Sequence, residues 1–396
     1  MRAPRDANNE VNGSNGVVQE PAPVEVPVET AAVEPVIETI EILPPATETI
    51  PPVAVDAPVE PEQEPAPPAP VAISSSGVTT PDPCPACGQR ESRALFSATD
   101  RLYGTTKKFF RIVECRNCRL IRLDPQPHPL ELHNYYPPKY WYTSETNTAD
   151  RLEQTYRRFV MRDHLHFVER ALRESEETGL VLDVGCGGGL FLQMLAERGV
   201  KNVVGLDFSL DAANVAWRRA GVPAVCSSLS RAPFAPQSCA AVTMFHVLEH
   251  LYDPASYLDA AHQLLRPDGR LIIQVPNAAC WQFLLLGERW NGIDVPRHLI
   301  DFRLSDVDSL LDSCGFEVLR HKHFSLRDNP AGLATSLAPS LDPMARRLRQ
   351  VEETPRERLM KDLLYMAIVA ASIPFTLVEA ACRAGSTIMV EARKKS

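Results

Sequence analysis

The chain has 396 residues and a formal net charge of −9 at pH 7, a length that allows two or three domains. The charge is unevenly spread, because residues 1–80 hold two basic and 13 acidic residues, which leaves the remainder with 39 basic and 37 acidic residues. A nearly neutral folded part argues against a large nucleic-acid footprint. The first twenty residues lack the apolar core of a signal peptide, so we expect a cytoplasmic protein with reduced cysteines.

Residues 1–80 form a segment without aromatic residues or cysteine and with 15 prolines. Valine, proline, glutamate and alanine recur there without a helical period. Such a composition buries too little apolar surface to offset the entropy lost on ordering. We predict an acidic, extended and disordered tail, which acts either as a tether or docking arm or has no specific partner.

Two C-x-x-C pairs follow, separated by a strand-like run of alternating residues. Four thiolates at this spacing are typical of a tetrahedral zinc site, and zinc would let about 40 residues fold with little core. Four cysteine ligands leave no open position for substrate, so the expected role is structural. The sequence predicts a zinc ribbon over residues 81–125, with the ligands Cys84, Cys87, Cys115 and Cys118.

Residues 126–178 begin with a loop rich in proline and aromatic residues. Its aromatic side chains could line an acceptor pocket, but the sequence favours a core that joins two domains. From Ala149 to Glu176 apolar residues recur with helical spacing, which predicts a helix leading into the next domain. The aromatic residues in question are Tyr135, Tyr136, Tyr140, Trp141 and Tyr142.

A strand, a glycine turn and a helix are predicted between Val181 and Leu192, where the sequence reads V-L-D-V-G-C-G-G-G-L-F-L. The apolar run suits a buried parallel strand, and the glycines allow positive φ and close approach of a ligand to the backbone. Leu190 stands where the dinucleotide fingerprint has its third glycine. The stretch instead resembles motif I of the class I S-adenosylmethionine (SAM) methyltransferases, D-x-G-x-G-x-G. The alternative is a glycine-rich turn in another α/β domain.

This resemblance implies a Rossmann-like α/β fold with a seven-stranded sheet and a SAM site in residues 179–325. Asp183, Gly185, Gly187 and Gly189 match the motif, and in that family the acid orients the amino-acid end of SAM. The bacterial relatives of this layout include quinone O-methyltransferases and sugar methyltransferases.

Asp207 ends the next predicted strand, where a carboxylate could accept hydrogen bonds from both ribose hydroxyls. Its alternative role is a helix N-cap. Phe208 is expected to flank the adenine. After the third strand, Ser228 and Leu229 stand where the family usually has an acid that contacts the adenine amine, so we assign the adenine contact to these two residues.

The fourth strand ends in F-H-V-L-E-H-L-Y-D-P, which resembles the V-L-E-H-x-x-D-P of the family. His246, Glu249 and His250 would share one face if this turn were helical. Related quinone O-methyltransferases have E-x-x-E-H here, which holds a divalent cation, so the three residues could bind one. The sequence favours the other interpretation, in which His246 packs near SAM while Glu249 and His250 shape the site.

The segment W-N-G-I-D-V-P-R-H-L resembles the P-R-H-L of the family near the acceptor. His298 is a candidate general base for an acceptor hydroxyl, and its alternative role is a structural histidine hydrogen-bonded within the loop. Arg297 would either clamp an anionic acceptor or form a salt bridge.

Residues 326–383 are predicted to form a lid and an apolar helical segment. Ser325 to Pro355 is polar, which predicts an irregular lid over the acceptor. Leu363 to Val378 is apolar but short for a membrane span, so it is either a buried hairpin or dimer face, or an element lying on a membrane. Residues 384–396 are predicted to be the last strand of the core, antiparallel to strand six.

Together these features predict a SAM-dependent methyltransferase that acts in-line on a small-molecule, glycan or lipid-linked acceptor, with an O-methyl product. SAM and a structural zinc ion are the expected cofactors. The alternatives are an RNA methyltransferase and a non-catalytic SAM-binding scaffold. The expected location is the cytoplasm, with contact to the inner face of the membrane through residues 363–378 as one option.

Overall fold

The computed structural model describes residues 82–137 and 148–395. The predicted tail at residues 1–80 and the side chains of Tyr140, Trp141 and Tyr142 lie outside the described residues. The described chain contains two sheets, one of four strands and one of seven.

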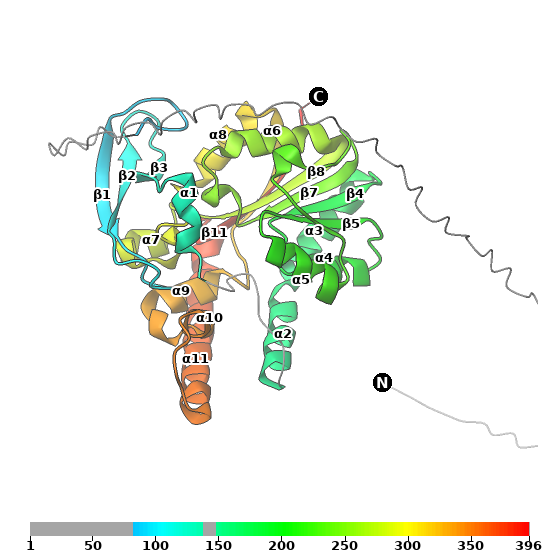
Figure 1. Ribbon diagram of the computed structural model, residues 1–396. Helices are drawn as coiled ribbons and strands as arrows, with labels where there is room; N and C mark the ends of the chain where they lie inside the picture. The colour runs from blue at the N-terminus through cyan, green and yellow to red at the C-terminus, as the bar shows by residue number, and fades with distance from the viewer. Residues whose placement is uncertain (1–81, 138–147, 396) are drawn as a thin grey trace, which may run out of the picture. The chain divides into compact units, whose positions relative to one another are not determined.

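The seven-stranded sheet forms the centre of the catalytic region (Figure 1). A turn or the start of a helix follows each of the first three parallel strands of the chain. The last strand, β11, lies between β8 and β10 and is antiparallel to both. The α/β class and the antiparallel final strand predicted from the sequence are confirmed. In spatial order the strands are β10 (Phe316–Lys322), β11 (Thr387–Lys394), β8 (Leu265–Pro276), β7 (Cys239–Phe245), β4 (Leu180–Val184), β5 (Val203–Asp207) and β6 (Ala224–Cys226).

The order in which strands are added to the sheet reverses at β4. From β4 it proceeds to β5 and β6 on one side, and it then returns to add β7 and β8 on the other. Both neighbours of β4 are parallel to it. Ligands of open α/β sheets bind at the carboxyl ends of the strands beside such a switch point. The loops that follow β4, β5 and β7 therefore meet where a ligand is expected.

Helices cover both faces of this sheet, as the alternation of buried residues along the strands requires. Val181 and Ala241 pack against α3, α4 and α5, whereas Leu182 and Val242 belong to the core shared with α6 and α8. The helices concerned are α3 (Arg162–Ser175), α4 (Leu190–Glu197), α5 (Leu210–Ala220), α6 (Pro254–Leu264) and α8 (Leu304–Ser313).

Local signals in the sequence fix several helix ends. Asp253 caps α6 by accepting a hydrogen bond from the backbone N–H of Ser256, and Pro254 occupies the first turn, as predicted. The predicted single helix from Ala149 to Glu176 is instead two helices, α2 (Thr148–Val160) and α3. Met161 separates them.

The four-stranded sheet contains the cysteine ribbon and one strand from far along the chain. The strand order is β1 (Ser92–Ala98), β2 (Phe110–Cys115), β3 (Ile121–Asp124) and β9 (Ile300–Asp301). The ribbon is therefore not confined to residues 81–125, because β9 pairs with β3 and follows the P-R-H-L segment by one residue. Short elements stand between the strands: α1 (Pro129–Leu132) and η1 (His133–Tyr135) follow β3, η2 (Leu229–Arg231) and η3 (Leu248–His250) flank β7, and α7 (Trp281–Leu286), η4 (Gly287–Arg289) and η5 (Asn291–Ile293) lead from β8 to β9.

Residues 325–383 are helical, which corrects two predictions. The polar stretch expected to be irregular contains α9 (Asn329–Leu337), η6 (Pro339–Leu341) and α10 (Pro343–Leu348). The apolar stretch is no hairpin but part of one helix, α11 (Pro355–Ala381), which extends away from the sheet (Figure 1). A capping box between Thr354 and Glu357 starts that helix.

Candidate functional site

The glycine turn after β4 has an open backbone. Gly185, Gly187 and Gly189 all have positive φ, between 51° and 76°. A Cβ atom on Gly187 would meet no heavy atom within 4 Å, so this part of the turn faces free space that a ligand could enter. A Cβ atom on Gly185 would come within 2.8 Å of Val247. The turn therefore touches the loop that follows β7.

Asp207 holds this turn from the end of β5. One carboxylate oxygen accepts the N–H of Gly187 at 3.0 Å, and the other accepts the N–H of Ser209 at 2.9 Å. Burial raises the pKa of Asp207, and these backbone N–H groups oppose the rise. Ser209, and not Asp207, caps α5, because its hydroxyl accepts the N–H of Ala212. The structure thus excludes the N-cap role for Asp207.

Asp183 lies buried beneath the glycine turn. Its carboxylate accepts a hydrogen bond from the hydroxyl of Thr243 on the neighbouring strand β7 at 2.6 Å. Burial raises the pKa of Asp183 to about 7, despite that hydrogen bond. The residue therefore joins β4 to β7 at the switch point.

The residues predicted to surround the adenine lie at the ends of β5 and β6. Phe208 is 65% exposed, and its ring lies 6.4 Å from that of Tyr136 in an edge-on contact. Leu229 is buried at the start of η2, and Ser228 precedes it as a partly exposed residue. Their assignment to the adenine stays a prediction.

The H-x-x-E-H segment at the end of β7 is not an α-helical turn. His246 has a positive φ of 56°, and a 3-10 helix, η3, contains Glu249 and His250. Nδ1 of His246 lies 3.1 Å from Glu249, while its Nε2 faces Gln274 at 2.9 Å and Asp328 at 3.6 Å. Burial disfavours the charged form of His246, but Asp328 and Glu249 raise its pKa to about 9.

A different set of ligand-type side chains comes together in the described residues. Glu249, His250 and His298 each offer one ligand atom, and these atoms lie within 4.8 Å of one another. The alternative cation set of His246, Glu249 and His250, which the sequence did not favour, differs from this cluster in one member, since His298 stands in the place of His246. The physical reason is the left-handed backbone of His246, which turns its side chain toward Gln274 and Asp328.

Both histidines of this cluster are oriented by backbone carbonyls. Nδ1 of His298 donates to the carbonyl of Gly292 at 2.8 Å, and Nδ1 of His250 donates to the carbonyl of Arg297 at 3.0 Å. A neutral imidazole that donates through Nδ1 accepts through Nε2. Burial and the neighbouring His298 lower the pKa of His250 to about 4, so His250 is neutral near pH 7.

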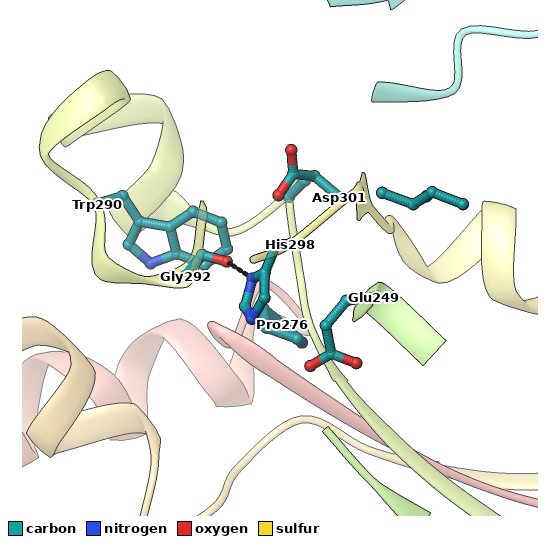
Figure 2. Close-up of a pocket in the computed structure, with 8 residues that line it drawn as sticks. Glu249, Pro276, Trp290, Gly292, His298 and Asp301 are labelled. Carbon is teal, nitrogen blue, oxygen red and sulfur yellow. Dashed lines mark hydrogen bonds between the residues drawn. The ribbon is translucent and has the colours of Figure 1, made fainter. Parts of the chain in front are cut away.

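His298 and Glu249 line a small, closely packed pocket (Figure 2). Trp290, Gly292 and Asp301 also line it, and Figure 2 shows the His298 ring between the Gly292 carbonyl and the Glu249 carboxylate. One oxygen of Glu249 has no hydrogen-bond partner although it is buried. Burial opposes the charge of Glu249, but the hydrogen bond from His246 and the charge of that ring lower its pKa.

Asp301 is a residue of this pocket that sequence reasoning missed. It is buried, and neither carboxylate oxygen has a hydrogen-bond partner. Burial and the charge of Glu249 raise the pKa of Asp301 well above its usual value. The signal that could have revealed it is an acid three residues after His298 inside an otherwise apolar run.

Arg297 has a structural position, which excludes the anion-clamp role. Its side chain is fully buried, and its guanidinium makes hydrogen bonds to Asp100 in the ribbon, to Asp294 in its own loop and to the carbonyl of Tyr135. The salt-bridge alternative is the correct one. Tyr135 packs its ring edge-on against Phe110 of the ribbon at 5.8 Å, as expected of a residue that joins two domains.

Tyr136 contacts His250 of the Glu249, His250 and His298 cluster, and its role in an acceptor pocket stays a prediction. Its hydroxyl is 3.3 Å from Nδ1 of His250, and its ring approaches Phe208. Two consecutive tyrosines thus serve different purposes. Gln274 and Asp328 were also missed by sequence reasoning. The carboxylate of Asp328 accepts from Gln274 Nε2 at 2.6 Å, so the start of α9 contacts the end of β8.

The four cysteines of the ribbon converge as predicted. All four Sγ atoms lie within 4.8 Å of one another, and the Cys84–Cys118 and Cys87–Cys115 pairs are 3.5 and 3.6 Å apart. These distances exceed a disulfide bond by far. A tetrahedral site with Zn–S distances near 2.3 Å has sulfur–sulfur edges of about 3.8 Å, so the cluster is compatible with zinc.

The fold and the site together define a Rossmann-like protein with a nucleotide-type site at the switch point of its sheet. A family model described as a methyltransferase domain matches residues 156–321. A ubiquinone biosynthesis O-methyltransferase of Photorhabdus laumondii is 32% identical over 175 residues, which cover 41% of this chain and 71% of that protein. The chain belongs to the class I SAM-dependent methyltransferases.

Other relatives match over a shorter span. A protein of Mycolicibacterium smegmatis described as a probable S-adenosylmethionine-dependent methyltransferase is 32% identical over 35% of this chain. The chain spans about half the length of such relatives, 52% in this case and 56% for a ubiquinone biosynthesis O-methyltransferase of Pseudomonas aeruginosa. A solved SAM-dependent methyltransferase of Thermotoga maritima, described as a possible histamine N-methyltransferase, is 16% identical with a TM-score of 0.37 and covers 62% of this chain and 97% of that chain.

Proposed function

We propose that this chain transfers a methyl group from SAM to a hydroxyl oxygen of a small-molecule, glycan or lipid-linked acceptor. The observation that supports this proposal is the contact between two halves of one site. The glycine turn tied to Asp207 touches Val247, and Val247 is two residues before Glu249 in the histidine cluster. A donor site and a base thus meet at the carboxyl ends of β4 and β7.

The donor half fits SAM in its chemistry. SAM supplies a methyl group on a sulfonium that is already activated for in-line displacement. The free space over Gly187 admits a ligand, and Asp207 offers carboxylate oxygens beside it for the ribose hydroxyls. Phe208, exposed beyond the end of β5, provides an apolar ring for the adenine. The main contribution of the protein is then to position donor and acceptor.

The acceptor half offers a general base. Because Nδ1 of His298 donates to Gly292, its Nε2 carries a lone pair that can take the proton of an acceptor hydroxyl. A carboxylate oxygen of Glu249 lies within 4.8 Å of a ring nitrogen of His298, so its negative charge would stabilise the imidazolium that forms. The acceptor oxygen would then bond to the methyl carbon as the bond from that carbon to the sulfonium sulfur breaks, S-adenosylhomocysteine would leave, and His298 would hold the proton.

A divalent cation at Glu249, His250 and His298 is a second candidate for this half. The observation that favours it is the presence of two histidines whose Nδ1–H groups are fixed by carbonyls, together with an unpaired oxygen of Glu249. We prefer the base, since methyl transfer from an activated sulfonium to a hydroxyl needs a proton acceptor but no Lewis acid. Activity that survives removal of divalent cations by a chelator supports the base, and activity restored only by Mg²⁺ or Mn²⁺ contradicts it.

We also assign zinc to the cysteine cluster, with a structural role. The ribbon shares its sheet with β9 and its Asp100 with Arg297, so a filled cluster would help to hold the loop that carries His298. The module provides support and takes no part in methyl transfer.

The decisive experiment follows methyl transfer from labelled SAM by the purified full chain into fractionated cell extract. We expect label in a lipid, glycan or small-molecule fraction, and label confined to RNA contradicts the acceptor class. His298→Asn keeps a donor for Gly292 but removes the base, so it should lower turnover by about 10²–10⁴ while SAM still binds. His321→Asn is the matched control, because that histidine contacts Asp308 at the surface. SAM binding without transfer to any fraction supports the scaffold alternative.

A further inference from the structure

From Leu363 onward, helix α11 buries four polar side chains and one valine, and it exposes apolar residues. The buried positions include Tyr365, Ser372, Thr376 and Glu379. Glu379 accepts hydrogen bonds from the backbone and the side-chain amide of Gln282 in α7, and the hydroxyl of Tyr365 lies 2.8 Å from that of Thr335 in α9. From Leu363 to Ala381 every exposed residue is apolar. A helix on the surface of a globular protein normally shows the opposite arrangement.

The exposed apolar surface is large and continues onto neighbouring elements. In the described part of the chain, eighteen large apolar side chains are exposed, of which seven lie on α11, two on α7 and one on α9. Contiguous patches of this kind mark a surface that binds a partner or a membrane. The ten residues are Leu284, Leu285, Leu337, Leu359, Met360, Leu363, Leu364, Met366, Leu377 and Val378.

The width of this surface decides between a lipid surface and a second copy of the chain. At 100° per residue, the exposed residues between Leu363 and Ala381 span an arc of about 160°. A paired helix covers a narrower seam, which here would contain mainly Leu363, Leu377, three alanines and Pro374. Leu364 and Met366 at the edges of the arc, and the leucines of α7, would stay in water. A lipid surface covers all of them.

The geometry also fixes how the helix would meet the lipid. The stretch from Leu363 to Ala381 is about 28 Å long, and α11 is long and apolar enough to cross a membrane by length and composition. Its inner face, however, is packed on α9 and α7 at both ends of that stretch. A helix that packs one face on protein and leaves its opposite face exposed can lie in the plane of the membrane–water interface. Arg356 and Arg383 flank the apolar stretch, where headgroups would be.

We propose that the outer face of α11, extended by Leu284 and Leu285 of α7, binds a lipid bilayer in the plane of its interface. The face buries apolar side chains among the lipid chains while the catalytic sheet stays in water. Because basic and acidic residues are nearly balanced on α11, apolar burial rather than headgroup charge provides most of the affinity. This surface attachment is independent of the acceptor and of the methyl transfer proposed above.

Flotation of the full chain with phosphatidylcholine vesicles, with and without phosphatidylglycerol, tests the proposal. We expect the protein to float with both compositions, and the double variant Leu363→Glu/Leu377→Glu to float about tenfold less or worse. Leu130→Glu on α1 is the matched control, because that leucine is 76% exposed and lies outside the patch. An unchanged affinity for SAM shows that each variant is folded.

Two results would overturn the proposal. One is a full chain that stays in the soluble fraction with both kinds of vesicle, or a double variant that floats as well as the unaltered protein. The other is light scattering that finds the unaltered protein to be a dimer and the double variant to be a monomer. The surface would then be a dimer interface between two copies of the chain. Tryptophan fluorescence would measure which residues lie near the lipid chains. Brominated lipid should quench Trp281, which packs against Phe375 of α11, and should not quench the buried Trp290.

Discussion

Replacing Arg297 by methionine should destabilise the protein, because the side chain is a buried connection between three parts of the chain. Its guanidinium has five N–H donors, and five hydrogen bonds use them. Two go to Asp100 at 3.0 and 3.1 Å, two go to Asp294, and one goes to the carbonyl of Tyr135 at 2.7 Å. Methionine fills similar volume but leaves two buried carboxylates without a cation.

The magnitude follows from the burial of Arg297 and Asp100, whose side chains are both fully buried, and of Asp294, whose side chain is 12% exposed. Breaking a buried ion pair by removing one member costs about 3–5 kcal/mol. The pKa values agree in direction, since burial opposes the charge of Asp100 but Arg297 lowers its pKa to about 2. Relative to an unfolded value near 3.9, that shift corresponds to roughly 2–3 kcal/mol, which is present above pH 4 and is lost as the pH falls through 2. For a unit of this size we expect the melting temperature to fall by on the order of 10 °C.

Thermal unfolding of the full chain near pH 7, followed by circular dichroism, measures this change. Arg393→Met is the control, because Arg393 pairs with Glu317 at the surface and its loss should cost less than about 1 kcal/mol. The variant should also lose turnover, since the Arg297 carbonyl orients His250. If Arg297→Met melts like the control and shows only a higher KM for an anionic acceptor, the structural role is refuted. Arg297 would then bind the anionic acceptor instead.

Three further predictions follow from the site. Asp207→Asn should weaken SAM binding by about tenfold to a hundredfold in calorimetry, because one charged acceptor is lost, whereas the exposed Asp211→Asn should bind normally. The pKa of His246 in the folded protein is raised to about 9, so the stabilisation from its charge is complete below pH 6.5 and is lost as the pH rises through 9. The melting temperature should therefore fall between pH 6.5 and 9, and it should fall less in His246→Gln. Cys84→Ser should remove bound zinc in elemental analysis and lower the melting temperature, unlike Cys226→Ser outside the cluster.

The parts of the fold that could be predicted from the sequence are those with local signals. The glycine turn from Gly185 to Gly189, the strand before it and the acid at Asp207 are set by short-range patterns of apolar residues and glycine. The same reasoning identified the cap of α6 from Asp253 and Pro254. It overlooked an identical signal at Asp342 and Pro343, where α10 begins with the same kind of cap. That error arose from reading polar composition as irregular structure.

Long-range contacts explain the rest of what was missed. Asp100 and Arg297 are 197 residues apart, and no spacing in the sequence connects them. The left-handed backbone of His246 depends on packing around Gln274 and Asp328, which come from β8 and the start of α9. The position of His246 in the motif suggested a ligand, but the fold turned it away from His250 and brought His298 there instead.

The proposed acceptor half of the site therefore depends on contacts from both sheets. Strand β9 begins two residues after His298 and pairs with β3 of the ribbon, and the backbone N–H of Leu299 between them donates to the carbonyl of Glu249 at 2.7 Å. His298 is thus held on one side by the ribbon and on the other by the loop after β7. Since β9 pairs with β3 of the ribbon, whereas the SAM-binding turn is held by Asp207, the order of the cysteine cluster should affect the position of His298 more than that of the turn. Loss of the metal should then impair methyl transfer before it impairs SAM binding.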